Sequence, residues 1–206
     1  MDVSAFKKKP ILGIVRGVKA SQIELLIETV IDVGLETLEI TMNTAGAAEL
    51  IRKAKQAAAG RLTLGAGTVL SMQDLKLALK SGATFIVTPV LIKAVVEFCV
   101  KKKIPVFPGA LSPSEIYQAW NAGATCVKVF PAKFFGPEYF REVKGPFNNI
   151  QLLACGGVTP KNLKDYFSAG ANAVSFGESV FRKDWLADKN FKSIGQSVRK
   201  FMEVIN

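Results

Sequence analysis

The stretch LSPSEIYQAWNAGATCVKVFPA, Leu111–Ala132, contains one complete helix-to-strand unit. Its opening, Ser112–Glu115, supplies an N-cap hydroxyl, a proline at the first helical position and an acid at the third, as in a capping box. Gly123 follows the helical positions and can adopt the left-handed conformation that ends a helix. Cys126–Ala132 is a short apolar run rich in β-branched residues. The stretch therefore predicts a helix, a tight turn and a buried strand.

The same unit recurs along the whole chain. Eight apolar runs, each too short for a helix, alternate with segments that have the helical spacing of apolar residues. The runs are Ile11–Gly17, Thr37–Asn43, Leu62–Val69, Phe85–Val90, Val106–Leu111, Cys126–Ala132, Gln151–Gly157 and Ala173–Ser179. Three of the helical segments end on Gly-Ala before the next run, which makes the unit an internal repeat.

Eight strands that alternate with helices predict a (β/α)8 TIM barrel of parallel strands, an α/β fold in a single domain over residues 1–206. The apolar periodicity of Phe191–Ile205 predicts the eighth helix, which closes the ring. A doubly wound open sheet is the alternative. It is disfavoured because no Gly-x-Gly-x-x-Gly motif follows the first run.

The chain has no histidine. This excludes Ser-His and Cys-His nucleophiles, His-ligated zinc or iron sites and proton transfer by imidazole. Catalysis would have to use lysine, acidic residues, tyrosine, cysteine, backbone groups or a borrowed cofactor.

The formal net charge of +10 brings nucleic acids, membrane surfaces and anionic small molecules into question as partners. The excess lysines stand in short clusters such as Lys7–Lys9 and Lys101–Lys103, without a sustained basic helix. We interpret them first as solvated surface charge and second as charge that steers an anionic substrate. No nucleic-acid or membrane partner is expected.

Three cysteines, Cys99, Cys126 and Cys155, lie far apart in apolar runs. They are expected to be buried free thiols of a reducing compartment. The N-terminal residues lack the apolar region of a signal peptide, and no apolar stretch reaches the length of a membrane span. A soluble, cytoplasmic protein is predicted.

Three predicted strands carry a charge where an inward-facing barrel residue is normally apolar: Arg16, Glu39 and Lys128. Glu39 and Lys128 are the third residues of runs on even-numbered strands, so they could face each other in one interior layer. A buried structural ion pair, or a lysine that points outward along a helix, are the alternatives. A lysine in an apolar slot near Arg16 becomes a nucleophile towards carbonyls, and Glu39 is the evident proton carrier. The pair indicates Schiff-base chemistry.

The last two runs end in Gly156–Gly157 and in Gly177–Ser179. In barrels, the loops after strands seven and eight commonly bind phosphate through backbone N–H groups, and glycine lets the backbone approach the anion. Tight turns also need glycine, but the position on these two strands favours phosphate binding. Thr68, Pro89 and Phe130 close other runs and could line the mouth of the barrel or simply end their strands.

Seven motifs cover nearly the whole chain. They are Gly13–Gly17 (GIVRG), Leu38–Thr41 (LEIT), Gly65–Val69 (GAGTV), Val87–Pro89 (VTP), Pro108-Gly109, Val127–Pro131 (VKVFP) and Gly156–Pro160 (GGVTP). Jointly they resemble the family of 2-keto-3-deoxy-6-phosphogluconate (KDPG) and 4-hydroxy-2-oxoglutarate (KHG) aldolases. The resemblance implies a class I aldolase that needs neither metal nor cofactor and assembles as a homotrimer of (β/α)8 barrels.

The resemblance also implies residue roles. It implies Lys128 as the Schiff-base lysine and Glu39 as the general acid and base. Thr68 and Pro89 would lie near the pyruvyl group of the substrate, with Phe130 packed beside it. The residues implied to bind phosphate are Gly156, Gly157, Gly177 and Ser179. The implied reaction is the reversible cleavage of KDPG to pyruvate and glyceraldehyde 3-phosphate.

The chain departs from the family pattern at three positions. Asn43 stands where the phosphogluconate enzymes often carry an arginine for the substrate carboxylate, and it is more similar to the 6-phosphogalactonate branch; Arg16 could supply the cation. Cys155 stands where many members have threonine, and Glu178 where glycine is common. The phosphogalactonate analogue (KDPGal) and 4-hydroxy-2-oxoglutarate are therefore alternative substrates. A phosphate-binding isomerase or cyclase barrel and a non-catalytic phosphate- or keto-acid-binding barrel are the other functions considered.

Overall fold

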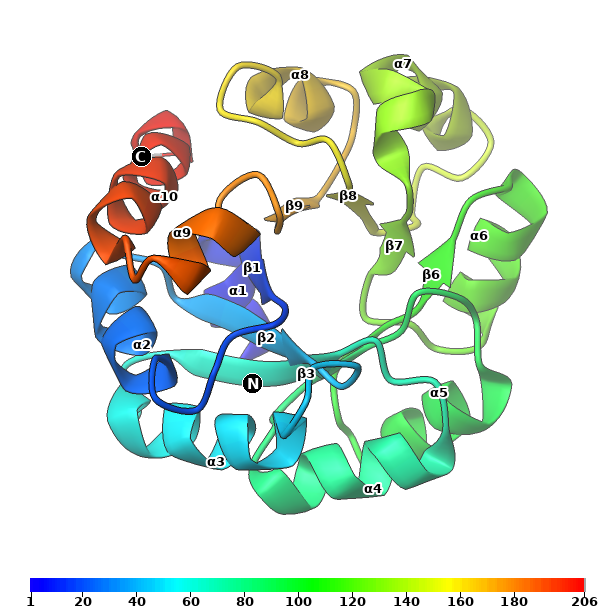
Figure 1. Cartoon of the computed structure of the whole chain (residues 1–206). Coiled ribbons are helices and arrows are strands. Elements are labelled where there is room, and N and C mark those ends of the chain that lie inside the picture. The colour runs from blue at the N-terminus through cyan, green and yellow to red at the C-terminus, as the bar shows by residue number, and fades with distance from the viewer. Residues whose placement is uncertain (206) are drawn as a thin grey trace.

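The computed structural model describes residues 1–205, and its parallel strands form a central ring surrounded by helices (Figure 1). The predicted TIM-like barrel is confirmed. The strands are β1 Ile11–Val15, β2 Thr37–Thr41, β3 Thr63–Gly67, β4 Ile86–Val87, β5 Val106–Phe107, β6 Gly109–Ala110, β7 Val127–Val129, β8 Leu152–Cys155 and β9 Ala173–Phe176. Their order around the sheet is β5-β4-β3-β2-β1-β9-β8-β7-β6.

The outer ring contains one helix after each predicted strand. These helices are α2 Ile23–Asp32, α3 Ala47–Ala58, α4 Met72–Ser81, α5 Lys93–Lys101, α6 Pro113–Asn121, α7 Gly136–Lys144, α8 Leu163–Ser168 and α10 Phe191–Ile205. The predicted eighth helix is therefore α10. Three short helices were not predicted: α1 Val3–Lys8, the 3-10 helix η1 Ala132–Phe134 and α9 Lys183–Ala187. No helix within residues 1–205 is long and apolar enough to cross a membrane.

One predicted strand is divided in two. Val106 and Phe107 of β5 pair with β4, whereas Gly109 of β6 pairs with Lys128 of β7. Pro108 lies between them and has no N–H to continue a ladder, although its carbonyl accepts a hydrogen bond from the Lys128 N–H at 2.9 Å. The chain itself thus links the two ends of the sheet, and eight predicted runs become nine strands.

The helix-to-strand unit at Leu111–Ala132 folds as its residues predict. The Ser112 hydroxyl accepts the N–H of Glu115 at 3.3 Å, and the Glu115 carboxylate accepts the N–H of Ser112 at 2.8 Å. Gly123 has a φ of +98°, so it takes the left-handed conformation that ends α6. Local signals therefore determine both ends of this helix.

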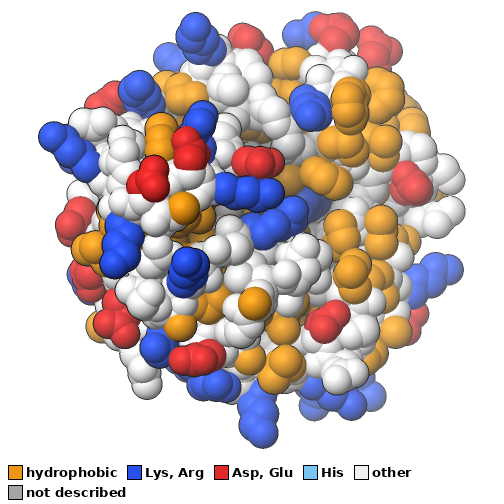
Figure 2. Space-filling view, viewed as in Figure 1, with side chains coloured by type: hydrophobic (Ala, Val, Ile, Leu, Met, Phe, Trp, Pro, Cys, Tyr) orange, Lys and Arg blue, Asp and Glu red, His pale blue; other side chains and the backbone are white. Residues whose placement is uncertain are grey.

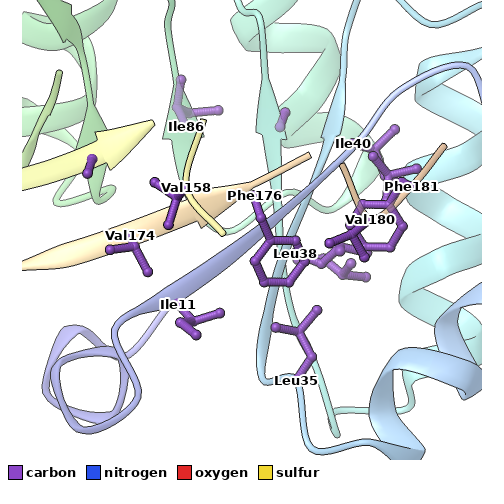
Figure 3. Packing of buried hydrophobic residues seen from close by; sticks show 14 of the residues in the cluster. Ile11, Leu35, Leu38, Ile40, Ile86, Val158, Val174, Phe176, Val180 and Phe181 are labelled. Carbon is purple, nitrogen blue, oxygen red and sulfur yellow. The ribbon is translucent and has the colours of Figure 1, made fainter. Parts of the chain in front are cut away.

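Two apolar layers stabilise the barrel, one on each face of the sheet. The outer layer packs strand residues against the helices, and Figure 3 shows Leu38 and Phe176 beside Phe181 in this layer. The Phe176 ring is stacked on Phe201 of α10, with 4.4 Å between ring centroids. Because side chains alternate across a strand, the residues between these outward positions face the barrel interior.

Aromatic rings fill the interior at the end where the strands begin. Phe6 of α1 packs edge-on against Phe107, and Phe107 packs in the same way against Phe85, with centroid distances of 5.7 and 5.8 Å. All three rings are buried. Helix α1 therefore closes this end of the barrel and leaves the carboxyl ends of the strands as its mouth.

The three cysteines are buried and free, as predicted. Cys99 belongs to the outer layer, whereas Cys126 and Cys155 belong to the interior cluster. Burial raises the pKa of the Cys99 thiol to about 11 and also raises the pKa of Cys126. Both thiols are therefore poor nucleophiles at neutral pH.

Candidate active site

Glu39 and Lys128 both lie buried inside the barrel. Their side chains are only 1% and 7% exposed. Leu38 and Ile40, the neighbours of Glu39 on β2, belong to the outer layer, so Glu39 faces inward. The alternative of an outward lysine is wrong, and within residues 1–205 the two groups form no ion pair within 4.0 Å. The charge of Lys128 therefore acts on Glu39 without a salt bridge between the two side chains.

The surroundings of the Glu39 carboxyl change its pKa. Burial raises its pKa above that of a free glutamate, and the positive charges of Lys128 and Arg16 counteract part of this rise. Its Oε2 atom is buried and has no hydrogen-bond partner within the described chain. A carboxyl with a raised pKa and an open oxygen is suited to accept and release a proton.

Gly67 at the end of β3 makes room for this carboxyl. A Cβ built on Gly67 would overlap Oε1 of Glu39 and would come within 2.5 Å of its carboxyl carbon. The position of the Glu39 carboxyl therefore explains why residue 67, in the motif Gly65–Val69, is a glycine. Any side chain at position 67 would displace the Glu39 carboxyl.

Replacing Gly67 with alanine should lower turnover about 100-fold with little loss of stability, because the colliding group is the end of a flexible side chain. A steady-state assay and a thermal melt measure the two effects. Gly13→Ala is the matched control, because its Cβ would approach Leu38 Cδ1 at 2.7 Å on the outer face of β1. The control should lose stability and keep its turnover. Equal losses of turnover in both variants would contradict the role of Gly67.

Lys128 has an aromatic neighbour at the mouth. Its Nζ atom lies 5.3 Å from the centroid of the Phe130 ring, and 41% of Phe130 is exposed. Pro89, at the end of β4, lies against Gly109, where an added Cβ would come within 2.8 Å of the Val90 nitrogen and overlap the Pro89 carbonyl. The structure thus places Phe130 beside Lys128, and it places Pro89 near the strand that pairs with Lys128.

Arg16 and Thr68 are the remaining polar residues of this cluster at the mouth of the barrel. Arg16 is exposed after β1, and its guanidinium donates a hydrogen bond of 3.5 Å to the Thr68 hydroxyl. Thr68 has a φ of +53°, a conformation that is costly for a β-branched residue. Side chains from β1, β2, β3 and β7 therefore converge on one place. Figure 2 shows Lys and Arg side chains at the centre of this face, in a hollow.

The two glycine loops lie beside this cluster. A Cβ built on Gly156 would lie 3.6 Å from the Phe130 ring and from Pro131. The β8 and β9 strands that carry the loops are paired in parallel, with Cys155 opposite Ser175. Within residues 1–205, three successive N–H groups on each loop donate to no protein acceptor: Gly156, Gly157 and Val158 after β8, and Gly177, Glu178 and Ser179 after β9. Such groups can bind an anion.

Not every predicted residue joins the cluster. Asn43 is exposed and makes no hydrogen bond within the described chain. The buried hydroxyls of Thr41 and Thr44, which form a hydrogen bond to each other at 3.0 Å, are not among the predicted site residues. Strand alternation could have indicated Thr41, because it lies two residues after Glu39. The bond to Thr44 depends on the fold of a loop, which a period-2 pattern does not predict.

A cavity of about 680 Å³ lies at the opposite end of the barrel. Its lining includes Met1, Thr63 at the start of β3 and Thr84 just before β4. None of the predicted site residues borders it. Its position at the closed end separates it from Glu39 and Lys128.

The family model described as "KDPG and KHG aldolase" matches residues 3–197. The chain belongs to this aldolase family. A curated relative, the 2-dehydro-3-deoxy-phosphogluconate aldolase of Haemophilus influenzae, is 34% identical over 188 residues, which is 90% of this chain and 88% of the relative.

Two further comparisons involve phosphogalactonate enzymes or their structures. The 2-dehydro-3-deoxy-6-phosphogalactonate aldolase of Escherichia coli K12 is 29% identical, over 96% of this chain and 97% of the relative. A solved structure described as native KDPGal has a TM-score of 0.88 and 30% identity, over 95% of this chain and 93% of that one. Members of the aldolase family thus match both the sequence and the barrel from end to end.

Proposed function

We propose that the protein is a class I aldolase that reversibly cleaves KDPG to pyruvate and glyceraldehyde 3-phosphate. One observation carries this proposal: a buried lysine and a buried, unpartnered glutamate face the same interior of a KDPG and KHG aldolase barrel. Lys128 supplies the nucleophile, and Glu39 supplies a group that moves protons.

The first half of the reaction forms a covalent bond to the substrate. The Lys128 amine attacks the C2 ketone, and Glu39 transfers a proton to the resulting oxygen of the carbinolamine. Loss of that oxygen as water leaves an iminium ion between Lys128 and C2. The raised pKa of Glu39 favours this step, because the carboxyl must hold a proton before it delivers one.

The second half breaks the carbon–carbon bond. Glu39, now a carboxylate, takes the proton of the C4 hydroxyl, and the C3–C4 bonding electrons move into the iminium to give an enamine and a free aldehyde. Glu39 then returns a proton to C3. Water hydrolyses the restored iminium, which releases pyruvate and regenerates the Lys128 amine. The positive iminium is the electron sink throughout.

The cations and the aromatic ring at the mouth orient the pyruvyl half. Arg16 and the hydroxyl of Thr68, which lie within hydrogen-bond distance of each other, are proposed to bind the substrate carboxylate. Phe130, beside the Lys128 amine, covers the apolar face of the bound carbon chain, and Pro89 borders the same space. Asn43 is exposed on the rim and is assigned to the hydroxylated part of the substrate.

The free N–H groups of the two glycine loops support a phosphorylated substrate. Six donors on neighbouring loops suit a dianion better than a single carboxylate. The relevant residues are Gly156, Gly157, Gly177 and Ser179. Glu178 is exposed, so its carboxylate can point away from the anion. KDPG is the first choice, with KDPGal and 4-hydroxy-2-oxoglutarate as alternatives, because relatives carry both phosphorylated names.

A coupled assay of pyruvate release tests this function. KDPG, its galactonate epimer and 4-hydroxy-2-oxoglutarate are compared at equal concentrations, and the two phosphorylated compounds should have the larger kcat/KM. Binding of pyruvate or phosphate without release of an aldehyde would instead indicate a non-catalytic barrel. Turnover without covalent trapping of pyruvate would indicate an isomerase or cyclase in which Lys128 acts only through its charge.

We also propose that the enzyme is a cytoplasmic homotrimer. Phe134 and Phe135 are 72% and 53% exposed, which is unusual for two adjacent aromatic residues on a soluble surface. Figure 2 shows hydrophobic side chains gathered on the side of this face near α6 and α7. Free buried thiols suit a reducing compartment.

Light scattering of the purified protein should give three times the chain mass of 22.2 kDa. Changing both Phe134 and Phe135 to aspartate should produce monomers, because buried like charges oppose the contact. Leu25→Asp, on the exposed face of α2, is the control and should leave the mass unchanged. A trimer that survives the double change would place the interface elsewhere.

A further inference from the structure

A hydrogen bond to a buried hydroxyl connects the loop that carries Arg16 to the loop after β2. The Gly17 N–H donates a hydrogen bond of 3.0 Å to Oγ1 of Thr44. Thr44 is buried, and its hydroxyl also bonds to that of Thr41 at 3.0 Å. Thr41 is fully buried on β2, two residues beyond Glu39. A chain of three groups thus connects β2 to the residue that follows Arg16.

The acceptor in this chain is itself held firmly. The Thr44 N–H donates to the Thr41 carbonyl at 2.9 Å, and the Thr44 carbonyl accepts from the Ala47 N–H at 3.1 Å. Gly17 has less support, because it adopts a φ of +74° and nothing lies within 4 Å of where its Cβ would be. The direction of the chain at Arg16 therefore depends on the bond that Gly17 donates.

We propose that Thr44 is a positioning residue, whose hydroxyl holds the Gly17 N–H and thereby keeps the Arg16 guanidinium beside Thr68. This inference rests on the proposed function, because Arg16 is there assigned to the substrate carboxylate. Nothing in the reaction requires Thr44 to touch the substrate. Its effect is transmitted through the backbone of one residue.

A hydroxyl is needed at this position for a chemical reason. A threonine hydroxyl can accept one hydrogen bond while it donates another, which fits the bonds to Gly17 and Thr41. Valine has the same shape but accepts nothing, so the Gly17 N–H would have to turn towards water. Arg16 would then lose its fixed direction, and a small misplacement of a binding group is costly in catalysis.

The pH dependence of catalysis provides a specific readout. The charged groups that act on Glu39 are Lys128, from β7, and Arg16, from the end of β1. On the other side, β3 places Gly65 and Gly67 beside it, and these carry no charge. Since Arg16 lowers the pKa of Glu39, a displaced Arg16 lets that pKa rise. Because Glu39 must be protonated for the first step, the alkaline limb of kcat/KM should then move to higher pH.

The experiment compares Thr44→Val with Thr44→Ser in the full-length enzyme. The valine variant should show a roughly 10-fold higher KM and an alkaline limb displaced to higher pH, whereas the serine variant keeps the hydroxyl and should resemble the wild type. If the valine variant does not fold, Thr44→Ala provides the same comparison. An unchanged alkaline limb in the hydroxyl-free variant, or an equal defect in the serine variant, would overturn the proposal.

Amide hydrogen exchange separates this inference from the proposed function. The Gly17 N–H should be protected in the wild type and in Thr44→Ser, and it should exchange faster in Thr44→Val. This measurement needs no substrate, so it still reports on Thr44 if the wild type fails to release pyruvate. Protection of Gly17 in Thr44→Val would overturn the positioning role even in an active aldolase.

Discussion

Replacing Lys128 with methionine is expected to lower pyruvate release by at least about 10⁴-fold, because no other lysine among residues 1–205 is buried in the barrel interior to form the iminium. Methionine has nearly the same length and fits an apolar interior. Since Lys128 forms no ion pair within 4.0 Å in residues 1–205, the barrel should fold normally.

Covalent trapping measures the chemistry of Lys128 directly. Reduction with borohydride in the presence of pyruvate should add a pyruvate-derived mass to the peptide that contains Lys128. Lys133 lies just past β7 and is exposed, so Lys133→Met is the matched control and should retain the label on Lys128. A label on any other lysine, or no label in the active wild type, would refute the assignment.

Replacing Glu39 with glutamine is expected to slow turnover about 10³-fold while pyruvate binding persists, because the amide occupies the same space but transfers no proton. The space left by Gly67 accommodates a planar group of this size. Glu49→Gln, on the exposed part of α3, is the control and should leave kcat unchanged. Normal turnover in Glu39→Gln would remove Glu39 from the proton transfers.

The same substitution should stabilise the protein, and the gain should depend on pH. The pKa of Glu39 is raised in the folded state, so the folded chain binds this proton more tightly than the unfolded chain. Wild-type stability therefore falls as pH rises from the unfolded pKa through the folded one. Glutamine is insensitive to this change, so the Tm difference should be small at low pH and should grow as pH rises. A constant difference would contradict the raised pKa.

Much of the barrel could be predicted from the sequence because its signals are local. Runs of β-branched residues, the capping box at Ser112 and the glycine after α6 each act within a few residues of themselves. The division of β5 from β6 is different. It arises because Pro108 lies where the strand changes partners, and partners are a property of the closed sheet. Helix α1 was missed because its only buried residue is Phe6.

In the candidate site, too, some residues could be predicted from the sequence and some contacts could not. Glu39 and Lys128 could be predicted because a charge on a buried strand violates the apolar pattern, and the pattern also indicates the direction in which each points. The space beside Gly67 and the bond from Gly17 to Thr44 could not be predicted. Both are contacts between different strands or loops, and their residues look ordinary in the linear sequence.

The closure of the barrel by Phe6, Phe85 and Phe107 limits how Glu39 exchanges protons with solvent. Bulk water cannot approach Glu39 through this aromatic floor, so its carboxyl can exchange protons with solvent only through the mouth. The proton that Glu39 removes at C4 is therefore the nearest one available for C3, and any exchange of that proton with solvent passes through the mouth.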